Sequence, residues 1–171
     1  MINRGRGESR QALRNPQFLK EVKQRIKLPA VRRRVNNQAM IAYLWVALGG
    51  ALGSVGRYWL NGLVCDKFGA TFPFGTLAIN VTGSFLIGIF AGLALPEGRL
   101  EPQSRSFVTQ FLMIGVCGGY TTFSSFSLQT LILLRDREWL YAGGNILLSV
   151  LLCMIAVWVG FMLGSVFNPT K

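Results

Sequence analysis

Residues 106–134 read SFVTQFLMIGVCGGYTTFSSFSLQTLILL, a run of 29 residues without a charged side chain. As one continuous helix this run would be about 43 Å long, whereas the hydrocarbon core of a bilayer is about 30 Å thick. Its centre, Gly118-Gly119-Tyr120-Thr121-Thr122, joins two glycines to two β-branched residues, and both kinds have low helix propensity. We therefore predict a membrane span that is broken into two half-helices. Carbonyls freed by such a break need protein, water or an ion as a partner, so the break is a candidate ion site.

The chain contains three further runs without a charge, at residues 35–56, 68–96 and 139–170. Each is longer than the roughly 20 apolar residues that are needed to cross a hydrocarbon core. Together the four runs predict transmembrane helices at about 41–60, 74–95, 107–134 and 141–166. We therefore expect an all-α membrane protein with four transmembrane helices, the third of them broken, in a domain that covers residues 40–171.

The composition argues against an enzyme. Charged residues make up 15% of the chain and hydrophobic residues 51%, whereas a soluble domain has about 25% charged residues. Histidine is absent, which removes the usual general base and excludes a Ser-His-Asp triad. The predicted spans contain no Asp or Glu, so a carboxylate relay for protons is not supported. The three cysteines, Cys65, Cys117 and Cys153, have no metal-binding spacing.

The net charge of +11 comes mostly from residues 1–39, which hold eleven of the eighteen Lys and Arg residues and two Glu residues. Residues 40–171 keep a charge of only +2, so the basic character does not indicate that the body binds nucleic acid. We expect residues 1–39 to form a disordered tail. Three interpretations of the tail stay open: a dispensable leader before a start at Met40, an anchor for anionic lipid headgroups, or a transit peptide or nucleic-acid-binding arm.

The predicted loops give the body little preference for one orientation in the membrane. Counted from Met40, one side has three Lys or Arg residues, and the other has three, or four if Arg57 is included. Because orientation follows the count of Lys and Arg, we expect insertion in both directions and hence an antiparallel, dual-topology homodimer. The tail would add eleven positive charges to one side, so a translated tail conflicts with dual insertion.

Polar and small residues recur on one face in each of the first two spans. Gly49, Gly53 and Arg57 are spaced every four residues, and glycines in this pattern are typical of close helix packing. Arg57 either reaches out to the membrane surface or lies at an entrance for an anion. Thr76 and Asn80 share a face of the second span. The Asn80 amide either bonds a neighbouring helix or offers two N–H donors to an anion.

In the last two spans, too, the notable residues can serve either packing or function. Phe123 and Phe126 lie three residues apart, a spacing that is common in packed cores. The alternative is electrostatic, because the positive edges of aromatic rings can line a path for a small anion. In the fourth span, Asn145, Ser149 and Cys153 form a polar stripe on one face.

At these motifs, from about Tyr43 to Gly160, the sequence resembles the Fluc-type fluoride channels, also called CrcB proteins. The resemblance rests on Gly49-x3-Gly53-x3-Arg57, on Gly75-Thr76-Leu77-x2-Asn80-x2-Gly83-Ser84-Phe85 and on Gly118-Gly119-Tyr120-Thr121-Thr122-Phe123-Ser124-Ser125-Phe126. It implies an antiparallel homodimer in the lipid bilayer of the cell (inner or plasma) membrane. Its two pores would conduct fluoride passively out of the cell and so limit fluoride toxicity.

The same resemblance implies roles for individual residues. The backbone carbonyls of Gly118 and Thr121 would bind one structural sodium ion (Na+) between the subunits. The residues implied to line the fluoride pore are Thr76, Asn80, Phe123, Phe126 and Ser149, with Arg57 toward a vestibule.

The sequence departs from the family at two positions of uncertain role in the pore. Asn145 stands where the family usually has a tyrosine, and Gln129 where a glutamate is frequent. Both side chains can still form hydrogen bonds. Two other functions remain as alternatives. One is a small multidrug exporter, which needs a glutamate in its first span, whereas residues 41–60 contain no acid. The other is a membrane assembly protein that conducts no ions.

Overall fold

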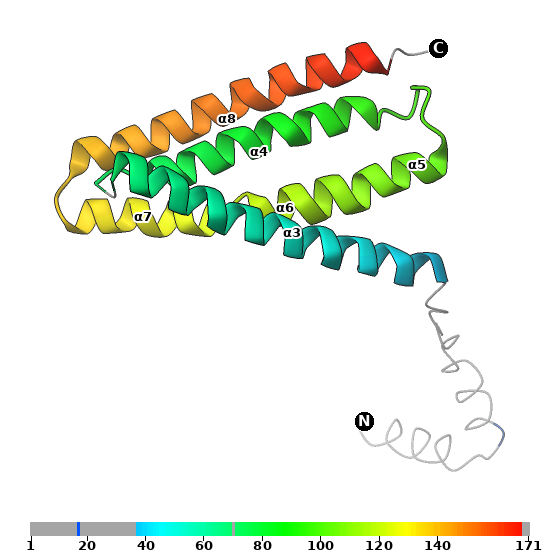
Figure 1. Ribbon diagram of the computed structural model, residues 1–171, viewed down its shortest axis with the longest axis horizontal. Coiled ribbons are helices and arrows are strands. Elements are labelled where there is room, and N and C mark those ends of the chain that lie inside the picture. Colours follow the sequence, from blue (N-terminus) through cyan, green and yellow to red (C-terminus); the bar gives the residue numbers. More distant parts are fainter. Residues whose placement is uncertain (1–16, 18–36, 70, 169–171) are drawn as a thin grey trace, which may run out of the picture. The chain divides into compact units, whose positions relative to one another are not determined.

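The computed structural model describes residue 17 and residues 37–69 and 71–168, and all regular structure in this part of the chain is helical. The helices, labelled in Figure 1, are α3 (Asn37–Phe68), α4 (Phe74–Leu93), α5 (Pro102–Phe107), the π-helical η1 (Val108–Cys117), α6 (Gly118–Tyr120), α7 (Phe123–Arg135) and α8 (Trp139–Phe167). The predicted tail, residues 1–39, lies almost entirely outside the described residues.

Four helical segments are long and apolar enough to cross a membrane: Ala39–Phe68, Phe74–Leu93, Pro102–Arg135 and Trp139–Phe167. The four spans that the uncharged runs predict are therefore confirmed. The first span continues beyond residue 60, because nothing interrupts the helix before Gly69. Gly69 has a positive φ of 76°, and its N–H bonds the Cys65 carbonyl at 2.9 Å. A left-handed glycine of this kind commonly ends a helix.

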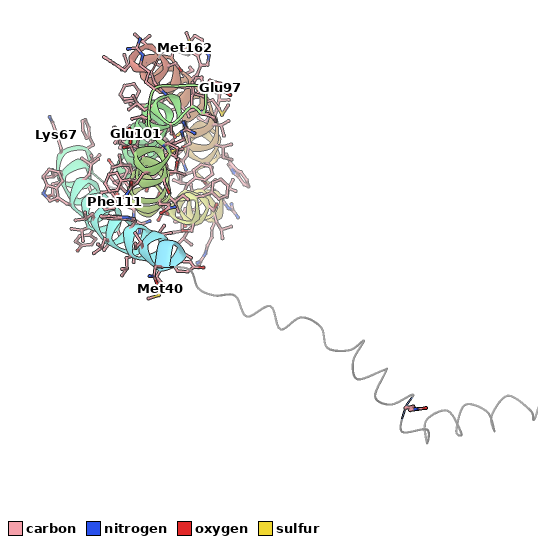
Figure 2. The ribbon with its side chains drawn as sticks, turned by 90° about the vertical axis from the view of Figure 1, so that its right-hand side faces the viewer. Met40, Lys67, Glu97, Glu101, Phe111 and Met162 are labelled. Atoms are coloured by element: carbon pink, nitrogen blue, oxygen red, sulfur yellow. The ribbon has the colours of Figure 1, made fainter. Side chains whose placement is uncertain are left out.

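Large apolar side chains cover the outer faces of the helices. Tyr58, Leu140 and Phe123 are among the most exposed of them. Figure 2 shows the side chains radiating from the ribbon, with Met162 on the outside of α8. The buried positions of α8 are mostly occupied by Ala, Gly, Ser and Asn. A soluble domain has the opposite arrangement, so this surface is suited to lipid or to another subunit.

Glycines allow α4 and α8 to lie close together along most of their length (Figure 1). A Cβ atom on Gly160 would collide with the backbone of α4 at Phe85, and one on Gly88 would collide with the backbone of α8. Gly92 and Gly164 repeat this arrangement one turn further along. Backbone atoms cannot move aside as a flexible side chain can, so the separation of the two helices depends on these glycines.

The first and third spans also meet through glycines. A Cβ atom on Gly49 would lie 2.5 Å from the carbonyl oxygen of Phe111, and one on Gly53 would collide with the carbonyl of Val116. Both contacts are between α3 and η1. Gly49 and Gly53 thus lie where the first and third spans approach most closely, and these two residues help to fix the position of the third span.

Replacing Gly160 by alanine should destabilise the protein, because the new methyl group would overlap the backbone of α4. We expect Gly160→Ala to lower the free energy of unfolding by about 1–3 kcal/mol, measured by tryptophan fluorescence during unfolding in detergent. Gly143 is the matched control, because a Cβ atom there would meet nothing within 4 Å. Equal stability of Gly160→Ala and Gly143→Ala would contradict the proposed packing constraint.

Candidate ion site at the broken span

The third span is interrupted at Thr121 and Thr122, where the backbone is extended. Helix α6 ends at Tyr120, the φ and ψ angles are −75° and 154° at Thr121 and −149° and 109° at Thr122, and α7 starts at Phe123. Thr122 begins the second half-helix, because its Oγ1 accepts a hydrogen bond of 3.2 Å from the Ser125 N–H. Threonine in extended conformation is a favourable N-cap. The predicted break is thus present.

The break lies at the end of the predicted segment, and its glycines remain helical. Gly118 and Gly119 both belong to α6. Gly119 instead allows close packing against α3, since a Cβ atom there would lie 2.5 Å from the carbonyl oxygen of Gly50. The interruption lies at the β-branched pair, Thr121 and Thr122, and not at the glycines. Thr122 can bond the start of the next helix with its own side chain, whereas glycine has no side chain to do so.

Asn80 of α4 holds the interruption in place through two hydrogen bonds to one residue. Its Nδ2 donates to the Thr122 carbonyl at 3.1 Å, and its Oδ1 accepts from the Thr122 N–H at 2.8 Å. The amide therefore supplies the partners that a regular helix would have supplied. Asn80 does bond a neighbouring helix, as one of its two predicted roles requires. Nδ2 carries two hydrogens, so one N–H remains for a further acceptor.

Several backbone carbonyls lose their helical donors at the break, among them those of Gly118 and Thr121. The N–H of Thr122, which would bond Gly118 in a continuous helix, bonds Asn80 instead. The N–H of Ser125, which would bond Thr121, is taken by the Thr122 hydroxyl. The carbonyls of Gly118 and Thr121 are thus available to a cation. The described residues contain no group of three or more His, Cys, Asp or Glu side chains that could hold a metal ion.

Three further residues fix the turn before the break, and the sequence interpretation gave none of them an individual role. The hydroxyl groups of Tyr120 and Thr82 are 2.9 Å apart, and the Ser54 hydroxyl donates to the Gly119 carbonyl at 3.4 Å. Gly83 leaves room for this contact, because a Cβ atom there would lie 3.0 Å from the Tyr120 ring. The signals in the sequence that could have pointed to Thr82 and Ser54 were the predicted site residues beside them, Asn80 and Gly53.

A cavity of about 460 Å³ opens beside the break. It contains three of the predicted site residues, Arg57, Thr76 and Gln129, and Arg57 is the only charged residue in its wall. The Oε1 of Gln129 is buried and has no hydrogen-bond partner within the described chain. The other residues in its wall are Ser54, Tyr58, Asn61, Ile79, Thr122, Ser124 and Ser125. A wall with one cation and many hydroxyl and amide groups can receive an anion or water.

The two predicted pore phenylalanines have different surroundings. Their ring centroids are 5.3 Å apart, with the planes inclined by 46°. Phe126 is buried, with 9% of its surface exposed, whereas Phe123 is 78% exposed. The subunit therefore brings the rings together but covers only one of them, and the face of Phe123 is left to lipid or to another subunit.

Asn145 and Ser149 lie in a second polar group, between α7 and α8. The Ser149 hydroxyl donates to Asn145 Oδ1 at 3.4 Å, and Asn145 Nδ2 donates to the Thr130 hydroxyl at 2.8 Å. Thr130 in turn donates to the Phe126 carbonyl at 2.8 Å. Sequence reasoning missed Thr130. Polar site residues thus form two groups, one at the cavity and one along α8. The segment from Thr122 to Phe126 lies between them, because Thr122 is in the cavity wall and the Phe126 carbonyl bonds Thr130.

The sequence is similar to those of known proteins. The family model described as "CrcB-like protein, Camphor Resistance (CrcB)" matches residues 44–161. A protein of Opitutus terrae named "Fluoride-specific ion channel FluC" is 56% identical over 132 residues, which are 77% of this chain and 98% of the relative. Relatives of the same name from Methylocella silvestris and Rhodospirillum rubrum are 51% and 52% identical, over 75% of this chain and 97% and 98% of their own lengths.

Removal of the Asn80 amide should loosen the break. In Asn80→Ala the N–H and the carbonyl of Thr122 lose their partners, and each unpaired buried group costs about 1–3 kcal/mol. We expect hydrogen–deuterium exchange of a peptide covering the break to be at least about tenfold faster than in the unsubstituted protein. Gln110→Ala is the control, since among the described residues the Gln110 amide bonds only Ser106, four residues earlier in the same span. Unchanged exchange in Asn80→Ala would contradict the role of the amide.

Proposed function

Because the chain belongs to the CrcB-like family, in which the relatives described above are named fluoride-specific ion channels, we propose that it is a fluoride-specific ion channel. It is a multi-pass protein of the plasma membrane and not an enzyme. Fluoride passes through it without energy input, out of the cell, which limits the toxicity of cytoplasmic fluoride. Fluoride is its substrate, and the lipid bilayer is its environment.

The observation that carries this proposal is the uncharged break in the third span, with its two nearby groups of polar side chains. Fluoride is strongly hydrated, so a pore must replace its water by donors that bind without trapping. A fixed positive charge in the middle of the path would retain the ion, whereas amide and hydroxyl groups bind less strongly. Asn80 at the break is neutral and retains one N–H.

The cavity is the proposed entrance to this path. Arg57 attracts the anion there, and Thr76 with Gln129 offers it polar partners. The narrow part follows the half-helix that starts at Phe123. The positive ring edges of Phe123 and Phe126 line this part while they exclude water. Beyond it the ion meets the polar group on α8, in which Asn145 takes the place of the tyrosine of the family and Ser149 follows one turn later.

A second copy of the chain completes the channel in this proposal. The exposed Phe123 ring supports such an interface, because a pore residue cannot work while it faces lipid. The almost equal numbers of Lys and Arg on the two sides of the body support subunits that are inserted in opposite directions. The proposed assembly is therefore an antiparallel homodimer with two pores.

A structural sodium ion fits the residues present at the break. The carbonyls of Gly118 and Thr121 have lost their helical donors, and oxygen atoms of this kind are suitable ligands for a hard cation. An ion held by these carbonyls would supply positive charge at the break without a charged side chain. The contribution of this chain is the extended backbone that Asn80 holds open.

Two substitutions should abolish fluoride efflux from proteoliposomes to the level of protein-free vesicles. Phe126→Ile removes the positive ring edge at the narrow part of the path. Asn80→Asp removes the donor to the Thr122 carbonyl and adds a negative charge that repels fluoride. Efflux is measured with a fluoride-selective electrode, with chloride efflux in parallel.

The control for Phe126→Ile is Phe107→Ile, which changes an aromatic residue of the same span whose ring stacks on Phe111. This variant should conduct fluoride like the unsubstituted protein. No efflux from the unsubstituted protein would favour an assembly protein that conducts no ions. Undiminished efflux in both Phe126→Ile and Asn80→Asp would contradict the assignment of the pore.

Dual insertion predicts that a reporter at the C-terminus of residues 40–171 is found on both sides of the membrane. The full chain should report one side only, because residues 1–39 add eleven positive charges to one end of the first span. Protease accessibility of the reporter in inverted and right-side-out vesicles distinguishes the two cases. A single orientation for residues 40–171 would contradict the antiparallel dimer.

A further inference from the structure

A chain of three buried hydrogen bonds connects the pore turn of α7 with α8. It runs from the Phe126 carbonyl through the Thr130 hydroxyl and the Asn145 amide to the Ser149 hydroxyl. The side chains of Thr130, Asn145 and Ser149 are all buried, and only 1% of the surface of Asn145 is exposed. In the described part of the chain, the bond between Thr130 and Asn145 is the only side-chain hydrogen bond that joins α7 to α8. Sequence patterns and family resemblance assign no role to Thr130.

The chemistry of the donors determines the direction of each bond. The Phe126 carbonyl can only accept, so the single hydroxyl hydrogen of Thr130 points to it, at a distance of 2.8 Å. The Thr130 oxygen is then an acceptor, and only the NH2 end of the Asn145 amide can face it. The opposite end of the amide, Oδ1, consequently faces Ser149. Thr130 thus determines which end of Asn145 points to each neighbour.

This orientation decides which donors remain for an anion. Asn145 Nδ2 has two hydrogens and gives one to Thr130, so its second N–H has no partner in the described chain. The Ser149 hydroxyl is held by Oδ1 at 3.4 Å, a long bond from which an anion could draw it away. With the amide reversed, its oxygen would face the oxygen of Thr130, and its NH2 group would face Ser149.

We propose that Thr130 is a positioning residue for fluoride conduction: its hydroxyl oxygen fixes the Asn145 amide and thereby the donors that Asn145 and Ser149 offer to the ion. This inference rests on the proposed fluoride channel function and names a further residue of the same path. A role in packing alone would not require the hydroxyl group, because valine fills nearly the same space without it.

Thr130→Val tests the proposal, because valine keeps the shape of threonine and removes the acceptor. In proteoliposomes like those of the efflux test above, we expect its fluoride efflux to be about fivefold slower, the factor that one lost hydrogen bond typically produces. Thr130→Ser keeps the hydroxyl group and should conduct within about twofold of the unsubstituted protein. Thr130→Ala is a second variant without a hydroxyl group and should show the same loss as Thr130→Val, although it leaves space where valine fills it.

The matched control is Thr109→Val. Thr109 forms the same bond to a carbonyl four residues earlier, at 2.9 Å to Arg105, and among the described residues its hydroxyl has no partner on another membrane span. Its replacement should leave efflux unchanged. The second measurement is the effect of Thr130→Val in an Asn145→Ala background. No amide is left to orient there, so the substitution should cause no further loss.

The outcomes separate the inference from the function on which it rests. No efflux from the unsubstituted protein overturns the proposed channel function. If the unsubstituted protein conducts and both Thr130→Val and Thr130→Ala conduct equally well, only the role of Thr130 is overturned. An equal loss from Thr130→Val with and without Asn145 also overturns it, because this result means that Thr130 acts through packing.

Discussion

The pairing of the Asn80 amide with the backbone of Thr122 is the interaction on which the rest of the site depends. An extended residue at membrane depth has an N–H and a carbonyl that lipid cannot satisfy. Asn80 satisfies both with one neutral side chain. It therefore allows the third span to be interrupted without adding a charge. The interruption frees the carbonyls of Gly118 and Thr121, and a new helix, α7, starts at Phe123.

Small residues place this pair at the correct distance. The break can meet α4 only because Gly83 leaves space beside Tyr120, and the half-helix before it meets α3 through Gly49, Gly53 and Gly119. The close contact of α4 with α8 keeps the other side of α4 fixed. Asn80 is consequently carried by a helix that packs on the backbone of α8 and on the Thr121 and Tyr120 side chains at the break, so its amide has a well-defined position.

Much of this architecture could be predicted from the sequence, because long uncharged runs are rare outside membrane spans. The four spans and the interruption of the third follow from the length of the runs and from Gly118–Thr122. The exact place of the break could not be predicted in this way. Helix propensity alone would allow a break at the glycines equally well, whereas the capping bond of Thr122 places it at the threonines. The contacts of Thr130 and Tyr120 were also not predictable, because they depend on which helices become neighbours.

The different exposure of Phe123 and Phe126 shows what a single subunit cannot provide. One ring is enclosed by the chain that carries it, whereas the other presents almost its whole surface to the outside. All polar partners of Thr122, in contrast, come from the same chain. In the proposed dimer, a newly inserted polypeptide can therefore form the pairing of Asn80 with Thr122 before it meets another copy, and the later association covers the Phe123 ring and completes the proposed sodium site. Biogenesis in two stages, first insertion with local closure and then docking, is the order that this division of contacts favours.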